Sequence, residues 1–346
     1  MRTAFSVLIA IACVVSGLPL VGPAVEARLL GERQVASPRA SRIAFASKRD
    51  GHWEVYAADA DGSNVKRLTT DRLQDRFPLW SPDASRIAYG SQREGGWELW
   101  VMRADGTDPK RLGTRLAAKS SRGWSPDGTS IVYETSRGGK GAIVVARADG
   151  SGEMQLSRAG HADDDRNPAW SPDGRRIVFS SARHGNREIY VMDADGRNVR
   201  RLTSDPGVDE YPAWSPDGSR IAFRSTRDGN RELYLVNPDG SGLQRLTDDP
   251  ADDDEPKWSP DGSRITFQSV RGNEYDFEVV RVADRTRTRL TATPGYDGMQ
   301  VWSPDGTELL FVSGRGNGDG LYVMRADGTG VRQLAATLTL NPAWSR

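Results

Sequence analysis

Hydrophobic and polar residues alternate along most of this chain in short runs separated by turn residues. Residues 221–225 (Ile-Ala-Phe-Arg-Ser) show a period of two, which predicts a strand with one buried face. A Ser-Pro-Asp-Gly turn precedes this run, because proline fixes φ and Gly218 permits the positive φ with which the chain leaves the turn. Residues 232–236 and 243–247 follow as two further strands, each after a turn containing glycine. With residues 211–214 in front, these segments predict a unit of four strands.

This four-stranded unit is repeated along the chain. The motif Trp-Ser-Pro-Asp-Gly, or a near copy of it, recurs every 44 to 46 residues, with its tryptophans at Trp80, Trp124, Trp170, Trp214, Trp258 and Trp302. A period in the forties with several short strands per period is typical of a β-propeller. One blade cannot bury both faces of its own sheet, so neighbouring blades must cover them.

The number of blades follows from an aromatic position in the second strand of each unit. It is occupied by Phe45, Tyr89, Tyr133, Phe179, Phe223, Phe267 and Phe311. The sequence also predicts one repeat cut in two, since residues 37–43 lack a preceding tryptophan strand and residues 341–346 form such a strand with no blade after it. We therefore predict an all-β fold over residues 36–346. It is a seven-bladed β-propeller of four-stranded blades, in which the C-terminal strand completes the first blade and protects the sheet edges.

The first 27 residues have a different character. Arg2 is followed by an apolar run over residues 4–16, and residues 25–27 (Val-Glu-Ala) resemble a small-residue cleavage site. Residues 1–27 are thus predicted to be a secretory signal peptide, with an uncleaved anchor or a lipoprotein modified at Cys13 as alternatives. Residues 28–35 form a short N-terminal segment. The expected location is extracytoplasmic, in the periplasm or secreted, with no transmembrane domain after cleavage.

Composition narrows the range of partners. Lys and Arg together number 47, as do Asp and Glu, so no nucleic acid or anionic membrane partner is predicted. The mean hydropathy of -0.60 suits an all-β protein rich in polar turns. The three histidines fall on three different predicted blades, at His52, His161 and His184. We therefore predict no metal site. No cofactor is predicted either, and the protein is expected to be a monomer.

The repeat also resembles a known family. The succession of Trp-Ser-Pro-Asp-Gly, an Ile-Ala-Phe strand, Ser-x-Arg-x-Gly, Ile-Tyr-Val-Met, Asp-Gly and Arg-Leu-Thr is similar to the TolB-type, WD-repeat-like propeller repeat, most clearly over residues 171–203. The resemblance covers about residues 36–346. It does not extend to TolB itself, which has a separate α/β domain before a six-bladed propeller.

The resemblance implies a protein-binding or scaffold module in the cell envelope or outside the cell, with a protein or peptide as partner. A carbohydrate-binding or carbohydrate-processing propeller is the alternative, because oligogalacturonate lyases resemble this repeat. Prolyl-oligopeptidase relatives carry such propellers beside a hydrolase domain, but the chain has no Gly-x-Ser-x-Gly motif. No catalytic residue is predicted, and whether the protein is an enzyme stays open.

Two sets of residues are candidates for binding. In the first, five aspartates each stand five residues before a motif tryptophan, and an arginine follows each aspartate by 18 residues. The aspartates are Asp75, Asp165, Asp209, Asp253 and Asp297, and the arginines are Arg93, Arg183, Arg227, Arg271 and Arg315. These residues form either structural ion pairs within the blades or an acidic ring at the channel mouth that binds a cation or a basic peptide.

The second set contains two tryptophans outside the repeat pattern. Trp53 and Trp97 share one loop position on adjacent predicted blades, where sister repeats place arginine. We therefore expect both indoles to be exposed, because arginine is rarely buried. With His52 and Arg49 they are predicted to form a platform for a peptide or a sugar ring, unless they pack onto a neighbouring loop instead.

Overall fold

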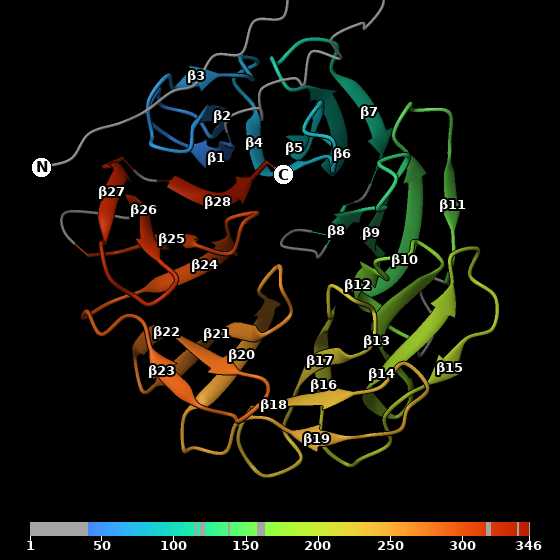
Figure 1. The fold of residues 1–346 in the computed structure, drawn as a ribbon. Coiled ribbons are helices and arrows are strands. Elements are labelled where there is room, and N and C mark those ends of the chain that lie inside the picture. The colour runs from blue at the N-terminus through green and yellow to red at the C-terminus, as the bar shows by residue number, and fades with distance from the viewer. Residues whose placement is uncertain are drawn as a thin grey trace, which may run out of the picture. The chain divides into compact units, whose positions relative to one another are not determined.

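The computed structural model describes residues 41–114, 116–117, 122–137, 139–157, 163–315, 320–337 and 339–345. These residues form seven four-stranded antiparallel sheets, which are the blades of a ring (Figure 1). The predicted signal peptide over residues 1–27, the segment 28–35 and His161 lie outside the described residues. Within the described part of the chain, no helix has the length and apolar character needed to cross a bilayer.

The strands follow the chain in a regular order. Blade 1 contains β28 (Thr339–Trp344), β1 (Arg42–Ser47), β2 (Glu54–Asp59) and β3 (Lys66–Arg67). Blade 2 contains β4 (Gln74–Trp80), β5 (Arg86–Arg93), β6 (Gly96–Arg103) and β7 (Lys110–Gly113). Blade 3 contains β8 (Arg122–Trp124), β9 (Ser130–Arg137), β10 (Lys140–Arg147) and β11 (Glu153–Gln155).

The other four blades repeat this order. Blade 4 contains β12 (Arg166–Trp170), β13 (Arg176–His184), β14 (Asn186–Asp193) and β15 (Arg200–Arg201). Blade 5 contains β16 (Asp209–Trp214), β17 (Ile221–Ser225), β18 (Glu232–Val236) and β19 (Gln244–Arg245). Blade 6 contains β20 (Asp252–Trp258), β21 (Arg264–Arg271), β22 (Glu274–Arg281) and β23 (Arg287–Arg289). Blade 7 contains β24 (Asp297–Trp302), β25 (Glu308–Ser313), β26 (Gly320–Arg325) and β27 (Arg332–Ala335).

The C-terminal strand closes the ring as predicted. β28 pairs antiparallel with β1, with Ile43 opposite Trp344 and Ala44 opposite Ala343. The backbone N–H of Ser345 donates to the carbonyl of Arg42 at 2.8 Å, and the backbone N–H of Arg42 donates to the Ser345 hydroxyl at the same distance. In Figure 1 the red β28 lies beside the blue β1. The seven-bladed closed propeller predicted from the split repeat is confirmed.

The core lies between the blades. All seven aromatics of the second strands are at most 3% exposed. Each packs with residues of the preceding blade in the ring: Phe45 of blade 1, for example, belongs to one cluster with Leu310 and Val323 of blade 7. Because the apolar face of each sheet is covered by its neighbour, the ring is stabilised by contacts between units as well as within them.

The two ends of the ring differ. Because successive strands are antiparallel, the turns from first to second strand and from third to fourth strand lie at one end, which we call the uniform end. The connections from second to third strand and from one blade to the next lie at the other end, which we call the variable end. The uniform end repeats one turn six times, in which a serine hydroxyl donates to the aspartate two residues later at 2.5–2.6 Å.

Candidate functional site

The tryptophan platform expected on the surface is covered. Trp53 is only 8% exposed, and Trp97 is half-buried. The guanidinium carbon of Arg76 lies 4.4 Å from the ring centroid of Trp53 and 6.0 Å from that of Trp97, and Phe77 meets Trp97 edge to face at 5.3 Å. The two indoles do lie on neighbouring blades and share Arg76. The exposure predicted for Trp53 is wrong because β4 places Arg76 over both rings.

The other two platform residues do not join this cluster. His52 is exposed at the variable end. The guanidinium of Arg49 lies over the rings of Phe45 and Tyr56 in its own blade, at 5.3 and 4.8 Å from their centroids. Arg49 is half-buried there, so it stacks on the blade core and stands apart from the two tryptophans.

The five aspartates of the acidic register are all buried, with at most 1% of their surface exposed. Three of them form the ion pair expected from the spacing, at 2.9 to 3.0 Å: Asp165 with Arg183, Asp209 with Arg227, and Asp297 with Arg315. In each pair the arginine also lies over the aromatic rings of its own blade. A guanidinium held between a carboxylate and two rings tightens the blade, which favours the structural interpretation of these pairs.

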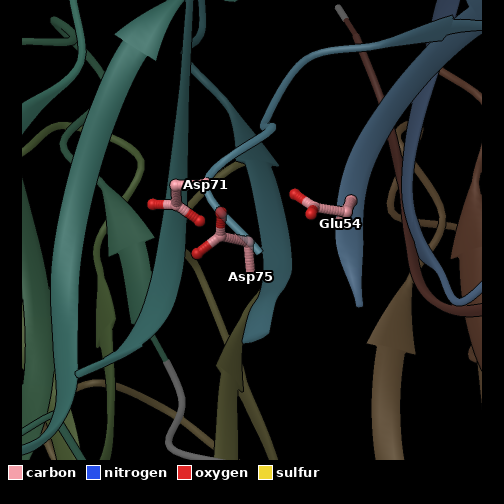
Figure 2. A group of neighbouring side chains, drawn as sticks. All are labelled: Glu54, Asp71 and Asp75. Atoms are coloured by element: carbon pink, nitrogen blue, oxygen red, sulfur yellow. The ribbon is translucent and has the colours of Figure 1, made fainter. Parts of the chain in front are cut away.

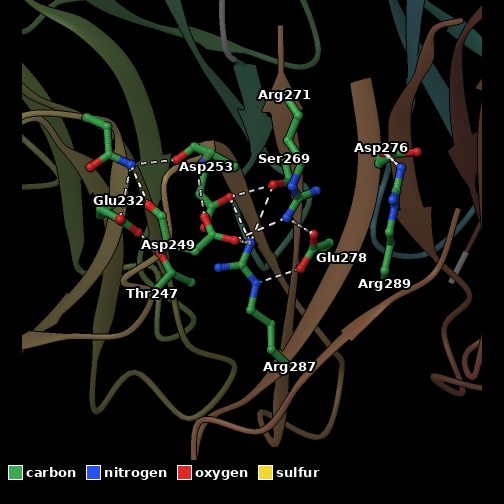
Figure 3. Close-up of polar contacts among 12 residues, drawn as sticks. Glu232, Thr247, Asp249, Asp253, Ser269, Arg271, Asp276, Glu278, Arg287 and Arg289 are labelled. Atoms are coloured by element: carbon green, nitrogen blue, oxygen red, sulfur yellow. Dashed lines mark hydrogen bonds and ion pairs between the residues drawn. The ribbon is translucent and has the colours of Figure 1, made fainter. Parts of the chain in front are cut away.

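Blade 6 departs from this pattern. Asp253 pairs with Arg287 of β23 at 3.1 Å and accepts a hydrogen bond from Ser269 at 2.8 Å (Figure 3). Arg271 turns instead to Glu278, at 2.6 Å, and to Asp249. Glu278 stands opposite Phe267, where the equivalent residues of blades 4 and 5 are tyrosines, and its carboxylate attracts both arginines. The pair predicted between Asp253 and Arg271 is therefore wrong.

Burial changes the proton affinity of Asp253. Desolvation raises the pKa of this carboxyl from 3.8 to about 7, against the opposing effects of Arg287 and Ser269, which favour the ionised form. Desolvation likewise raises the pKa of Asp209 to about 6. These shifts report carboxylates held away from water, as expected of structural residues.

Blade 2 is the second exception. Arg93 pairs at 2.8 Å with Asp71, in the connection between blades 1 and 2, and so the pair predicted between Asp75 and Arg93 is wrong. Among the described residues, no donor meets hydrogen-bond geometry at either oxygen of Asp75, although the hydroxyls of Ser91 and Thr69 lie near enough to oppose the rise in its pKa. Desolvation raises the pKa of Asp75 to about 6, and the charges of Asp71 and Glu54 add to the rise. Oxygens of Glu54, Asp71 and Asp75 lie within 4.8 Å of one another (Figure 2).

Sequence reasoning missed Glu54, Asp71 and a set of residues on the innermost strands. The first strands of neighbouring blades pack on one another, so they surround the axis of the ring. Among the described residues of these strands, six positions, each three residues before the tryptophan, carry a non-glycine residue with positive φ: Phe77, Asn167, Tyr211, Glu255, Met299 and Asn341. A bulge in each strand accommodates it. The residue type at this position differs from one repeat to the next, and this difference was the signal by which the sequence could have identified these residues.

The two described histidines do not share a site. His52 belongs to blade 1, and His184 belongs to blade 4, where its Nδ1 lies 2.6 Å from the hydroxyl of Tyr190 and its ring stacks on that tyrosine.

Residues 34–165, 163–249, 210–275 and 250–346 match the family described as the TolB beta propeller domain. The chain belongs to this family. No curated protein matches it in sequence. TolB from Acinetobacter baumannii is 23% identical, over 85% of this chain and 79% of that one, with a TM-score of 0.59.

Enzyme structures share the propeller as well. An oligogalacturonate lyase in complex with manganese is 18% identical over 82% of this chain and 85% of its own, with a TM-score of 0.65. A puromycin hydrolase is 17% identical with a TM-score of 0.68, and the match spans 87% of this chain but only 53% of the hydrolase. At these identities the likeness shows the fold alone.

Proposed function

We propose that this protein is an exported TolB-like propeller that acts as a protein-binding or scaffold module in the cell envelope or outside the cell. Its partner is a protein or peptide that docks on the variable end of the ring. The proposal is carried by the contrast between the two ends. Six equivalent hydrogen-bonded turns form the uniform end, whereas the loops of the variable end differ from blade to blade.

The variation of these loops supports a recognition role. The connection from second to third strand takes residues 48–53 in blade 1 but only Gly185 in blade 4. Connections between blades range from residues 336–338 after blade 7 to residues 156–165 after blade 3. Diverse loops held by a rigid scaffold are the usual place for binding residues. Loops that only joined strands would be expected to stay as uniform as the opposite turns.

Within this end we assign different roles to the four candidate residues. His52 and Trp97 retain exposed surface and are proposed to contact the partner. Trp53 and Arg49 lie beneath, stacked with arginine or aromatic neighbours, and are proposed to hold the loops in shape. The export proposed here rests on the predicted signal peptide, and the protein is proposed to act as a monomer.

A carbohydrate ligand is the second candidate. It is favoured by the half-buried indole of Trp97 beside the Arg76 guanidinium, because a partly exposed aromatic ring with a polar neighbour is suited to stack on a sugar. A glycan array separates the two candidates. Retention of a defined oligosaccharide that is lost in Trp97→Ala would replace the protein-binding proposal.

Site-specific cross-linking tests the proposed surface. A photoreactive amino acid is placed at His52, at the variable end of blade 1, and in a second protein at Val65, which is 42% exposed at the uniform end of the same blade. After illumination in the native envelope fraction, we expect a discrete adduct from position 52 and none from position 65. Equal adducts from both positions, or one from position 65 alone, would contradict the proposal.

A further inference from the structure

The junction between blades 1 and 2 contains three carboxylates, and among the described residues only Asp75 of the three has no ion-pair partner, because Arg67 pairs with Glu54 and Arg93 pairs with Asp71. Glu54 at the start of β2 and Asp75 in β4 are completely buried, while Asp71 in the connection between the blades is exposed. Figure 2 shows the carboxylates of Asp71 and Asp75 close together, with that of Glu54 turned toward them. In the described part of the chain, no donor meets hydrogen-bond geometry at either oxygen of Asp75, and only the neutral hydroxyls of Ser91 and Thr69 lie close enough to favour its ionised form. A buried carboxylate of this kind is costly unless a cation or donor compensates it.

Two other junctions show how the protein compensates the equivalent buried aspartate. The equivalent carboxylates are Glu188, Asp205 and Asp209 between blades 4 and 5, and Glu232, Asp249 and Asp253 between blades 5 and 6. At the first of these, Arg227 lies 2.9 Å from Asp209. At the second, Arg287 reaches Asp253 from a different strand, at 3.1 Å (Figure 3). A guanidinium thus occupies the site in both cases, even where the usual arginine has been drawn elsewhere.

The junction of blades 1 and 2 lacks this guanidinium. The arginine of the register, Arg93, lies 4.7 Å from the ring centroid of Trp100 and pairs with Asp71. Trp100 replaces the tyrosine found at this position in blades 4 and 5. The Ser91 hydroxyl accepts no bond from the Nε of Arg93, although the equivalent serines of those blades accept a bond from their arginine Nε. Arg93 is thus drawn to Asp71 in the connection between the blades, and the carboxylate of Asp75 has no guanidinium beside it among the described residues.

We propose that Glu54, Asp71 and Asp75 bind a calcium ion, which takes the place of the missing guanidinium. All three ligands are carboxylate oxygens, which suit a hard cation, and Ca²⁺ tolerates an irregular set of protein ligands completed by water. The Thr69 hydroxyl donates to Glu54 at 2.6 Å, and Arg67 pairs with the same carboxylate, so Glu54 is fixed in orientation. The exposed side of Asp71 provides the entry path. This inference is independent of the proposed partner.

Calorimetric titration of the purified, chelator-treated protein with CaCl₂ tests the site. We expect one Ca²⁺ per chain and a rise in Tm on binding. Asp75→Asn should weaken binding at least tenfold, and Asp71→Asn, on the exposed side, should weaken it without disturbing the fold. Asp209→Asn is the matched control, because its register is the same but Arg227 fills its site, and it should leave calcium affinity within twofold of the parent.

The apo protein provides a second readout. Asp75→Asn removes an uncompensated charge, so in chelator its Tm should equal or exceed that of the parent, and the order should reverse in Ca²⁺. Arg93→Gln should tighten calcium binding, because a competing cation leaves Asp71. No heat or Tm change up to millimolar CaCl₂, unaltered binding in Asp75→Asn, or binding of Mg²⁺ but not Ca²⁺ would each overturn the assignment.

Discussion

Closure of the ring by the C-terminal strand can be tested at a single side chain. Trp344 in β28 and Trp302 in β24 occupy the same position in their blades, and they are 8% and 7% exposed. Trp302 is continuous in sequence with the rest of its blade, whereas Trp344 meets β1 from the other end of the chain. If closure makes the two blades equivalent, replacing either tryptophan by alanine should have a similar cost.

The magnitude follows from the burial of the indole. Truncation of a buried tryptophan costs ~3–5 kcal/mol through lost transfer free energy and the cavity that remains. Trp302→Ala additionally loses the hydrogen bond from its indole N–H to the carbonyl of Lys257, at 3.2 Å, which contributes about 1 kcal/mol. The expected losses are therefore ~3–5 kcal/mol for Trp344→Ala and about 1 kcal/mol more for Trp302→Ala.

Guanidinium denaturation followed by far-ultraviolet circular dichroism measures both variants. Removal of residues 341–346 should be more severe than Trp344→Ala, because it also uncovers the edge of β1 and removes the bonds between Arg42 and Ser345. A loss below ~1 kcal/mol for Trp344→Ala, together with the full loss for Trp302→Ala, would refute closure. It would mean that the C-terminal strand is not held in the first blade.

Three further predictions concern the variable end. Asp209→Asn should lower stability by ~3 kcal/mol in thermal or chemical denaturation, because Arg227 is left buried without its carboxylate; an unchanged Tm would contradict the ion pair. Trp53→Ala should cost ~3–5 kcal/mol and Trp97→Ala less, since only Trp53 is fully covered; equal, negligible losses would show that both rings are exposed. Because the pKa of Asp253 is raised to about 7, this carboxyl ionises in the unfolded chain before it ionises in the folded protein as pH rises, and the free energy of unfolding should fall between about pH 4 and 7. A plot of Tm against pH should therefore fall less steeply over that range for Asp253→Asn than for the parent, and parallel plots would contradict the shift.

The repeat made most of the fold predictable. Strand alternation, the Ser-Pro-Asp-Gly turns and the second-strand aromatics are local signals, and each recurs often enough to fix its own register. Closure of the ring could also be predicted from the sequence, because residues 37–43 and 341–346 are complementary halves of one repeat. These features depend on contacts within a unit or between identical positions of neighbouring units.

The candidate site was harder to predict because it depends on residues that depart from the repeat pattern. Glu278 replaces a tyrosine and redirects Arg271, and Trp100 replaces another and displaces Arg93. The spacing of aspartate and arginine is the same in all five blades, so it could not distinguish the three pairs that form from the two that do not. The cover over Trp53 comes from Arg76 on the next blade, a contact that the pattern of a single repeat does not contain.

Recognition through the variable end is tested most directly by hydrogen exchange with the captured partner. Exchange is compared for the free and bound protein in peptides that cover the variable-end loops 48–53, 68–73 and 202–208 and the uniform-end turns 81–85 and 215–219. We predict slower exchange in at least two adjacent variable-end loops and no change in the turns. Protection confined to the uniform-end turns would contradict the account, because the partner would then bind the face that the repeats keep the same.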